Sequence, residues 1–452
     1  MKFVHACLVF LTAAVLVPVN RADAKPPNIL FILIDDLGWM DLACQGNRLV
    51  ETPHIDQLSR QGMRFTDAYA AAPVCSPTRA AIATGLAPAR VRITNHMPDR
   101  PQFTPPNATL APAATVERLS HDYVTIAERL RQAGYDTGFF GKWHLTSREE
   151  PDYYPDRHGF EVNVGGCSFG GPPTFFDPYR IPTITNRQPG DYLPDRLADE
   201  AIEFMRTRRD KPFLVCLWNY TVHWPMEAPQ ALLDKYATRT GPGLNDTRYG
   251  AMIEGMDRAI GRVLHSLDEF GLSDDTLVVF TSDNGGFGGV ADNRPLRAAK
   301  GHLYEGGIRV PLIIRWPGRV KPATECSEPV ISMDFYPTML DAAGVLGKEE
   351  TFDGVSLTPL FADHPTLGRD ALYFHYPNYA WHRSNRLGGA IRQGRFKLIE
   401  RFDDQSVELY DLTTDLGEQH NLAGQKRELA RQLQQQLAAW REEVNAAMPT
   451  PR

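Results

Sequence analysis

Continuous apolar runs recur along the chain and predict the strands of a buried sheet. The clearest runs lie at residues 28–34, 136–140, 213–219, 276–281 and 311–315. Runs that are rich in β-branched and aromatic residues, with no polar alternation, are typical of strands covered on both faces. A further strand is predicted over 63–70, and helices are predicted over 53–61, 125–131, 194–208, 252–270 and 333–343. This alternation predicts an α/β domain with a large mixed, mostly parallel sheet sandwiched by helices.

The pattern changes after residue 365. Short alternating strands are predicted over 371–375, 389–392, 396–400 and 408–411, with turn residues between them. A helix follows, with one apolar stripe made of Leu429, Leu433, Leu437, Trp440 and Val444. We therefore predict a main domain over 25–365 and a smaller C-terminal subdomain, an antiparallel sheet plus a helix, over 366–452. The segment 149–190, rich in Gly, Pro and aromatic residues, is predicted to be a long surface excursion that shapes a pocket rim.

The first residues have the form of a signal peptide. Met1-Lys2 is followed by an apolar run over 3–19 and by the small-x-small sequence Ala22-Asp23-Ala24. We expect residues 1–24 to be removed and the mature protein to be exported, either to the periplasm or as a secreted protein. An uncleaved anchor is the alternative, but the run is short for a membrane-spanning helix and ends at Asn20-Arg21. No other apolar stretch approaches that length, so no membrane span is expected in the mature chain.

The composition narrows the function classes. The 452 residues are 42% hydrophobic and 23% charged, which is typical of a globular protein. The net charge of −7 and the lack of a basic run argue against a nucleic-acid partner. The six cysteines include no close Cys-x-x-Cys pair, which argues against a structural zinc site and a disulfide scaffold. Disulfides among Cys44, Cys167, Cys216 and Cys326, and the oligomeric state, are left open.

Acidic and amide side chains follow two of the predicted central strands. Asp35 and Asp36 come directly after the run 28–34, and Asp283 and Asn284 follow the run 276–281. The carboxyl ends of strands in an open α/β sheet border the ligand crevice, so these side chains are expected to meet there. Three carboxylates and an amide form an all-oxygen donor set, which suits a hard divalent cation such as Ca²⁺. The alternative is a pair of solvated turns in which the carboxylates cap the residues that follow.

A single cysteine, Cys75, lies just before a short apolar run that begins at Ala80. The segment Cys75-Ser76-Pro77-Thr78-Arg79 is predicted to be a loop that enters a helix. The unpaired N–H groups of a helix N-terminus, with Arg79 close by, favour a nucleophile at position 75 that faces an anion. The alternative is a buried thiol in a tight turn.

Basic side chains are expected at the same edge of the sheet. They are Arg79, Lys142, His144, His223 and Lys300. Burying five basic side chains costs desolvation free energy, which a purely structural role would not explain. Around a cation held by carboxylates, and together with a nucleophile, they would form an oxyanion pocket for a tetrahedral XO3 group. Each histidine could instead be a hydrogen-bonded structural residue.

Two of these segments carry a family resemblance. Cys75-Ser76-Pro77-Thr78-Arg79, followed by Thr84-Gly85, resembles the first signature of the formylglycine-dependent (type I) sulfatases in the alkaline phosphatase superfamily. The segment from Gly134-Tyr135-Asp136-Thr137 through Gly141-Lys142-Trp143-His144 is similar to their second signature. The resemblance implies an alkaline phosphatase-like fold, a catalytic domain over 25–365, and a sulfuric ester hydrolase.

The resemblance also implies a modified nucleophile and a metal. Cys75 would be oxidised to formylglycine (3-oxoalanine) by a formylglycine-generating enzyme that reads Pro77 and Arg79, and one hydroxyl of its hydrate would attack sulfur. One Ca²⁺ ion would lower the pKa of that hydroxyl and polarise the sulfate. The implied ligands of this ion are Asp35, Asp36, Asp283, Asn284 and the modified residue 75.

The basic residues would then move protons and hold charge. His223, with Lys300 as a second candidate, would protonate the departing oxygen. His144 would take the proton of the second hydroxyl and so expel sulfate. Arg79 and Lys142 would hold the formylglycine oxygens.

A sulfated carbohydrate is the expected substrate, such as a galactose or N-acetylgalactosamine sulfate, and small aryl sulfates are expected to fit the same sulfate pocket. The rim residues expected to meet hydroxyls and neighbouring anions are His96, Asp99, Arg100, Arg294, His375, His382, Arg383 and Arg386. Each of these could also belong to a solvated loop. Two alternatives stay open: a phosphate or phosphonate monoester hydrolase that uses the same residue, and a non-catalytic glycan-binding protein in which Cys75 remains a thiol.

Overall fold

The computed structural model describes residues 25–99, 101–348, 350–362, 366–379 and 385–452. The predicted signal peptide, over 1–24, lies outside these residues, as do Arg100, His382 and Arg383. None of the helices in the described part of the chain combines the length and the apolar character that crossing a bilayer requires. The domain boundary predicted at 365 falls at the edge of a gap in the description and stays a prediction.

An eight-stranded sheet forms the centre of the main domain. Its strands lie in the order β10 (Thr324–Cys326), β2 (Met63–Phe65), β9 (Leu312–Arg315), β8 (Thr276–Ser282), β1 (Asn28–Ile34), β7 (Phe213–Trp218), β5 (Asp136–Gly141) and β6 (Val162–Val164). All neighbours pair in parallel except β9, which runs antiparallel to both β2 and β8. The predicted mixed, mostly parallel sheet is confirmed.

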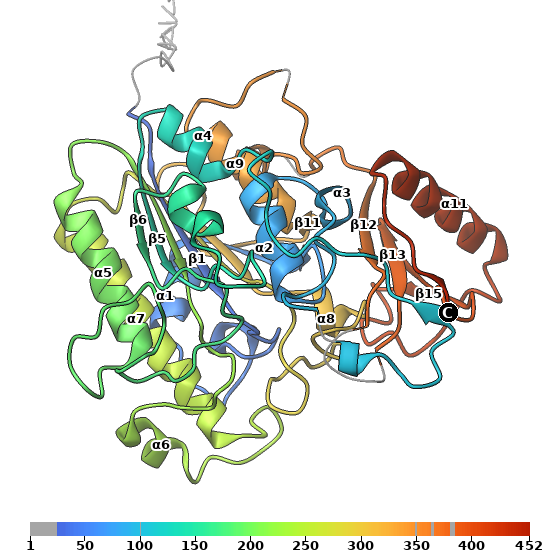
Figure 1. Cartoon of the computed structure of the whole chain (residues 1–452), viewed down its shortest axis with the longest axis horizontal. Helices are drawn as coiled ribbons and strands as arrows, with labels where there is room; N and C mark the ends of the chain where they lie inside the picture. The colour runs from blue at the N-terminus through green and yellow to red at the C-terminus, as the bar shows by residue number, and fades with distance from the viewer. Residues whose placement is uncertain (1–24, 100, 349, 363–365, 380–384) are drawn as a thin grey trace, which may run out of the picture.

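Helices cover both faces of this sheet because β1 is apolar on both sides (Figure 1). Its residues Leu30, Ile32 and Ile34 belong to one core cluster and Ile29, Phe31 and Leu33 to the other, and all six are fully buried. Such burial stabilises the fold by about 1.5–3 kcal/mol per side chain. The first cluster includes α1 (Pro53–Gln61), α5 (Leu193–Thr207), α6 (Gln230–Tyr236) and α7 (Thr247–Glu269). The second includes α2 (Cys75–Thr84), α4 (Ile126–Gln132) and α9 (Phe335–Ala342).

The C-terminal subdomain is a four-stranded antiparallel sheet with one helix, as predicted. Its strands follow chain order: β12 (Ala371–Tyr376), β13 (Gly388–Gln393), β14 (Phe396–Arg401) and β15 (Val407–Asp411). The helix α11 (Arg427–Glu443) packs Leu433 and Leu437 on one face of this sheet, and the other face packs on the main domain (Figure 1).

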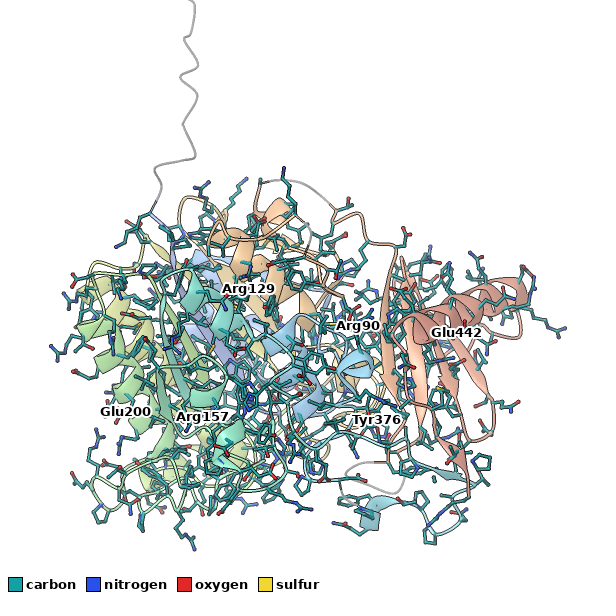
Figure 2. All side chains as sticks on the ribbon, turned by 45° about the horizontal axis from the view of Figure 1, so that its top comes forward. Arg90, Arg129, Arg157, Glu200, Tyr376 and Glu442 are labelled. Carbon is teal, nitrogen blue, oxygen red and sulfur yellow. The ribbon has the colours of Figure 1, made fainter. Side chains whose placement is uncertain are left out.

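Polar contacts also join the two parts. Arg90 lies near this junction in Figure 2, bound to Asp353 at 2.8 Å and 3.9 Å from Glu443 of α11. Tyr376, labelled in the same view, donates to Asn95 Oδ1 of the main domain at 3.2 Å.

Several short elements were not predicted. They are α3 (Pro88–Val91), α6, α8 (Glu305–Ile308), α10 (Thr358–Phe361), β4 (Leu110–Ala111), β6, β10, β11 (Val330–Ile331), β16 (Thr450–Pro451), η2 (Ala43–Gln45), η3 (Pro101–Phe103), η4 (Pro151–Tyr153), η5 (Pro155–Arg157) and η6 (Ser332–Asp334). The single strand predicted over 63–70 is wrong. The chain forms β2 and then β3 (Ala68–Tyr69), because Arg309 binds the carbonyl of Thr66 and the carboxylate of Asp67 between them.

Candidate active site

The residues predicted to form a site meet at the carboxyl edge of the parallel strands. Asp35 and Asp36 follow β1, Asp283 follows β8, and Lys142 follows β5. The chain beyond β7 brings His223 to the same place, with Nε2 3.8 Å from Asp36 Oδ2. Neighbouring parallel strands end together, so residues more than 200 positions apart in sequence become direct neighbours.

Cys75 lies at a helix N-terminus, as predicted, but the segment from Cys75 to Arg79 is the first turn of α2 and not a loop before it. The Cys75 side chain is fully buried, with Sγ 3.6 Å from Asp35 Oδ1 and 3.4 Å from Lys300 Nζ. Burial raises the pKa of the Cys75 thiol to about 12, although Lys142 and Lys300 oppose this. The thiol is therefore protonated at neutral pH, which makes it a weak nucleophile.

The acidic residues and Cys75 form one compact donor set. The ligand atoms of Asp35, Asp36, Cys75 and Asp283 lie within 4.8 Å of one another, and all four residues are buried. Asn284 donates from Nδ2 to Asp36 Oδ1 at 2.8 Å, while its own Oδ1 is buried with no hydrogen-bond partner among the described residues. A buried acceptor without a donor is costly unless a cation or another group meets it. The oxygen atoms of this set, from three carboxylates and one amide, therefore fit a hard divalent cation, whereas the Cys75 thiol does not.

Two lysines pair with the two adjacent carboxylates. Lys142 Nζ lies 2.7 Å from Asp35 Oδ2, and Lys300 Nζ lies 2.6 and 2.8 Å from the two oxygens of Asp36. Burial raises the pKa of Asp35 to about 7 even though Lys142 opposes it. Burial acts on Asp36 in the same direction, but Lys300 and His223 outweigh it and hold the pKa of Asp36 below its ordinary value.

Arg79 ties the helix that carries Cys75 to two other strand ends. Its Nε and Nη2 both lie 2.8 Å from Asp283 Oδ2, and its Nη1 donates to the backbone carbonyl of Lys142. The guanidinium also lies over the ring of Trp218, 5.5 Å from its centroid. Because Arg79 is fully buried, these contacts fix the position of Asp283.

Two buried histidines flank the cluster. His144 places Nδ1 3.3 Å from Ser76 Oγ, and its Nε2 contacts the carbonyl of Met97. Burial, followed by the charge of Lys142, holds the pKa of His144 well below its usual range. Burial and then Lys300 lower the pKa of His223 to about 3. Both imidazoles are therefore neutral in the structure as described.

Backbone strain is stored at the site. Asp36 has a φ of +63° and His144 a φ of +56°, in the left-handed region. Such a conformation costs on the order of 1–3 kcal/mol for a residue other than glycine, and it persists where the surrounding structure enforces it. The strain at Asp36 and His144 thus accompanies the placement of their side chains in the cluster.

A pair of glycines, which sequence reasoning did not single out as functional, packs against both histidines. A Cβ on Gly170 would lie 2.8 Å from His144 Nε2, and a Cβ on Gly171 would lie 2.7 Å from His223 Nδ1. Neither glycine has a left-handed φ, so the requirement is for space rather than for a special backbone conformation. The only signal in the sequence was that these glycines form one of two Gly-Gly pairs inside the segment 149–190.

The turn after Asp36 is held by a further carboxylate that was also missed. Asp41 accepts from the backbone N–H of Gly38 and from Tyr249 Oη, both at 2.6 Å, and from the backbone N–H of Asp292 at 2.8 Å. Tyr249 Oη also lies 3.3 Å from the Asp36 carbonyl. Nothing in the local sequence pattern links Asp41 to α7.

A pocket of about 390 Å³ opens beside the histidines. We call it the histidine pocket, and its lining includes His96, Met97, Arg148, Gly170, Gly171 and His223. Ser147, Glu149 and Ser168 add further polar groups to its wall. A ligand bound in this pocket would contact His223.

The predicted rim is only partly correct. His96 lines the histidine pocket, and Arg294 lines a second pocket. His375 is buried on β12 with Nε2 2.8 Å from the carbonyl of Ala447, so its prediction as a rim residue is wrong. Asp99 accepts from Asn95, and Arg386 pairs with Asp403 and Asp404. The five cysteines in the described residues are free.

The chain matches the sulfatases in sequence. The family described as Sulfatase matches residues 27–345, and the one described as N-sulphoglucosamine sulphohydrolase, C-terminal, matches residues 298–443. Human arylsulfatase A is 32% identical over 465 residues, covering 89% of this chain and 84% of the relative. A sulfatase of Formosa agariphila is 31% identical over 509 residues, covering 94% and 91%. N-acetylgalactosamine-6-sulfatase of Mus musculus is 31% identical over 433 residues, covering 88% and 77%.

Comparison with solved structures also places the chain among the sulfatases. The crystal structure of Ps i-CgsB in complex with k-i-k-neocarrahexaose matches with a TM-score of 0.78 at 28% identity, covering 92% of this chain and 93% of that chain. The phosphonate monoester hydrolase of Agrobacterium radiobacter shares the fold, with a TM-score of 0.69 at 21% identity over 94% of this chain and 99% of that chain. The chain therefore belongs to the type I sulfatases of the alkaline phosphatase superfamily and is a sulfuric ester hydrolase.

Proposed function

We propose that this sulfatase is exported and hydrolyses sulfate monoesters of carbohydrates, with formylglycine made from Cys75 as its nucleophile and one Ca²⁺ ion. The observation that carries the proposal is the buried cluster of Asp35, Asp36, Cys75 and Asp283, with Lys142 and Lys300 bound to it. Export rests on the signal-peptide pattern of residues 1–24 alone.

The proposed calcium ligands are Asp35, Asp36, Asp283 and the unpartnered Oδ1 of Asn284, with the modified residue 75 beside them. When bound, Ca²⁺ would polarise the sulfate and favour an ionised hydroxyl next to it. The chain's own cations would share the negative charge of the sulfate, since Lys142 and Lys300 already reach the cluster.

The buried thiol of Cys75 explains why a modified residue suits this place. A protonated thiol beside hard oxygen donors is poorly matched to both a hard cation and a sulfate ester. The hydrate of formylglycine would supply two hydroxyls, one to attack sulfur and one whose deprotonation releases sulfate. Cys75 begins α2, with Arg79 one turn later on the same helix, so the family motif and the site coincide.

The two histidines would handle the protons. His223 borders the histidine pocket, so it is placed to protonate the leaving oxygen, and an anionic sulfate ester would favour its protonated form. Lys300, bound to Asp36 and close to Cys75, is the second candidate donor. His144 is neutral and can accept a proton, and Ser76 and Met97 hold its ring from both sides.

A carbohydrate leaving group is favoured by the histidine pocket. Its wall carries Ser147, Arg148, Glu149 and Ser168, which offer hydroxyl and charged groups for a hydroxylated ring. Two relatives point the same way, since one is named N-acetylgalactosamine-6-sulfatase and the other was solved with k-i-k-neocarrahexaose.

Sulfate release from a panel of methyl glycosides, each with one sulfate at a defined position, tests the substrate class. The panel includes galactose and N-acetylgalactosamine sulfates, 4-nitrophenyl sulfate and the matching phosphate esters. We expect kcat/KM for the best sulfated glycoside to exceed that of its phosphate analogue by at least about tenfold, which is a difference of 1.4 kcal/mol. Faster cleavage of phosphate esters would overturn the assignment, and release from the aryl ester alone would overturn the carbohydrate part.

Gly171→Ala should slow turnover by crowding His223. The added Cβ would come 2.7 Å from His223 Nδ1 and 2.9 Å from the Trp224 carbonyl, so the imidazole must move. Displacing a reacting group by about 1 Å can lower kcat about a hundredfold. Steady-state kinetics with 4-nitrophenyl sulfate would show this loss in kcat.

The matched control is Gly424→Ala, where an added Cβ meets nothing within 4 Å. We expect Gly424→Ala to keep the kcat and the melting temperature of the unaltered enzyme, and Gly171→Ala to stay folded with a lower melting temperature because its Cβ also crowds the Trp224 carbonyl. An unchanged kcat in folded Gly171→Ala would show that His223 does not need its present position.

A further inference from the structure

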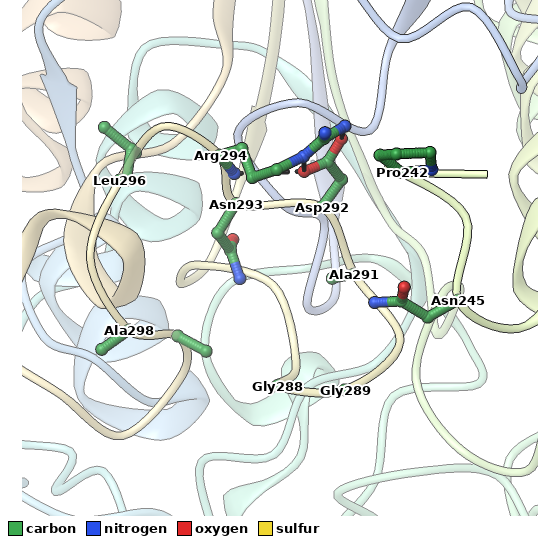
Figure 3. Close-up of a pocket in the computed structure, with 12 residues that line it drawn as sticks. Pro242, Asn245, Gly288, Gly289, Ala291, Asp292, Asn293, Arg294, Leu296 and Ala298 are labelled. Carbon is green, nitrogen blue, oxygen red and sulfur yellow. Dashed lines mark hydrogen bonds and ion pairs between the residues drawn. The ribbon is translucent and has the colours of Figure 1, made fainter. Parts of the chain in front are cut away.

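A second pocket of about 390 Å³ lies among loops outside the catalytic cluster. Figure 3 shows its wall, which includes Pro242, Asn245, Gly288, Asp292, Arg294 and Leu296. We call it the loop pocket. Asn245 points its side-chain amide into it from one side, and the backbone at Gly288 forms another (Figure 3).

The loop pocket is built on the residues that follow the proposed metal ligands. Its 288–299 segment leaves the end of β8 just after Asn284 and leads directly to Lys300. The backbone N–H of Lys300 donates to the Gly286 carbonyl at 3.1 Å, and a Cβ on Gly286 would lie 2.7 Å from the Cα of Gly38. Asp292 of its wall accepts from the backbone N–H of Met40 at 2.8 Å, so the wall of the loop pocket is packed against the turn that follows Asp36.

Trp224 lies beside Gly171 of the histidine pocket and near Arg248, which follows Asn245 of the loop pocket in sequence. It follows His223 directly, and its carbonyl lies 2.9 Å from the position of a Cβ on Gly171 in the histidine pocket. Its side chain is 41% exposed, although tryptophan is usually well covered. The ring has the guanidinium of Arg248 at 6.0 Å from its centroid, and Arg248 lies three residues after Asn245 of the loop pocket.

The loop pocket is electrically neutral. Arg294 donates from Nε and Nη2 to the two oxygens of Asp292, both at 2.7 Å, so its charge is paired within the wall. The Asp292 side chain is buried, and an anion that drew Arg294 away would leave that carboxylate unpaired. The remaining polar groups are amides, among them Asn245, which suit hydroxyl groups.

We propose that the loop pocket binds an unsulfated sugar of the same saccharide chain whose sulfated sugar occupies the histidine pocket, with the chain crossing the exposed face of Trp224. The proposal rests on the proposed function and makes the substrate an oligosaccharide rather than a monosaccharide. A tryptophan face offers a large, rigid apolar surface to a sugar ring, and Asn245 offers both a donor and an acceptor to its hydroxyls.

The test uses three probes that share the sulfated sugar with the highest kcat/KM in the glycoside panel. They are its methyl glycoside, a disaccharide whose second sugar is unsulfated, and a disaccharide whose second sugar is sulfated. We expect the unsulfated disaccharide to exceed the methyl glycoside by at least about tenfold in kcat/KM, and the sulfated one to show no such gain. Equal values for all three probes, or a preference for the sulfated second sugar, would overturn the proposal.

Variants of the subsite residues test whether the gain in kcat/KM from the second sugar arises at Trp224 and in the loop pocket. Trp224→Ala and Asn245→Ala should remove most of the gain from the second sugar, measured as the ratio of kcat/KM between the unsulfated disaccharide and the methyl glycoside. Trp224→Phe keeps an aromatic face and should keep most of the ratio, and Asn186→Ala, at an exposed asparagine outside both pockets, should leave it unchanged. A ratio unaffected by Trp224→Ala contradicts the subsite, whereas failure of the proposed function shows separately as no sulfate release from the methyl glycoside itself.

Discussion

Cys75→Ala should lower sulfate ester turnover by at least about 10⁴-fold, because it removes the nucleophile while the rest of the site remains. The methyl side chain fits a position where Sγ contacts only a few neighbours, Asp35 and Lys300 among them. Initial rates with 4-nitrophenyl sulfate, with the melting temperature as a folding check, would measure the loss. Cys44→Ala, at a half-buried cysteine outside the cluster, is the matched control and should keep full activity.

Cys75→Ser tests whether the enzyme needs the two hydroxyls of a formylglycine hydrate or only one nucleophilic hydroxyl at position 75. A serine hydroxyl could attack sulfur once, but it has no second hydroxyl through which His144 could expel sulfate. We therefore expect the variant to be inactive in the steady state and to retain sulfate on the peptide that contains residue 75, seen by mass spectrometry. In the unaltered enzyme, the same peptide should carry an aldehyde. An alkylatable thiol in all of a fully active preparation would rule out the formylglycine mechanism.

The sequence was informative wherever a long apolar strand ended in polar residues. The buried run of β1 predicted both a central strand and the place of Asp35 and Asp36, because strand ends of a parallel sheet share an edge. The same reasoning placed Asp283 after β8 and Lys142 after β5, and the structure brings all four together. The assignment of Cys75 to a formylglycine needed the family resemblance, since burial and spacing alone equally suit an inert thiol.

The remaining features depend on contacts that no local pattern encodes. The edge strands β6 and β10 have three residues each, too few for a periodicity to be recognised. Gly170 and Gly171 matter because His144 and His223, from the loops after β5 and β7, pack against them, and Asp41 matters because α7 places Tyr249 beside it. His375 was predicted at the rim from its residue type, but the pairing of β12 with β13 buries it.

Removing divalent cations should lower activity by at least about a hundredfold and destabilise the protein, because the cluster would lose the group that polarises the sulfate. Three buried carboxylates and the unpartnered Oδ1 of Asn284 would then face one another without a cation. A ligand present at 100 times its Kd stabilises the folded state by about 2.7 kcal/mol, so re-adding Ca²⁺ should raise the melting temperature of chelator-treated protein. Differential scanning fluorimetry measures this shift independently of activity.

Asn284→Ala tests the metal site without changing its charge. The variant loses the Oδ1 donor but keeps all three carboxylates, so it should need more Ca²⁺ for half of the melting-temperature shift and for half of the activity. The matched control, Asn163→Ala, removes an amide on the edge strand β6, away from the cluster, and should keep the calcium dependence of the unaltered enzyme. Activity and melting temperature indifferent to chelation would show that Lys142, Lys300 and Arg79 neutralise the carboxylates on their own. In that case the sulfate would be held by the chain's cations, and the calcium assignment would fail while the sulfatase assignment remained.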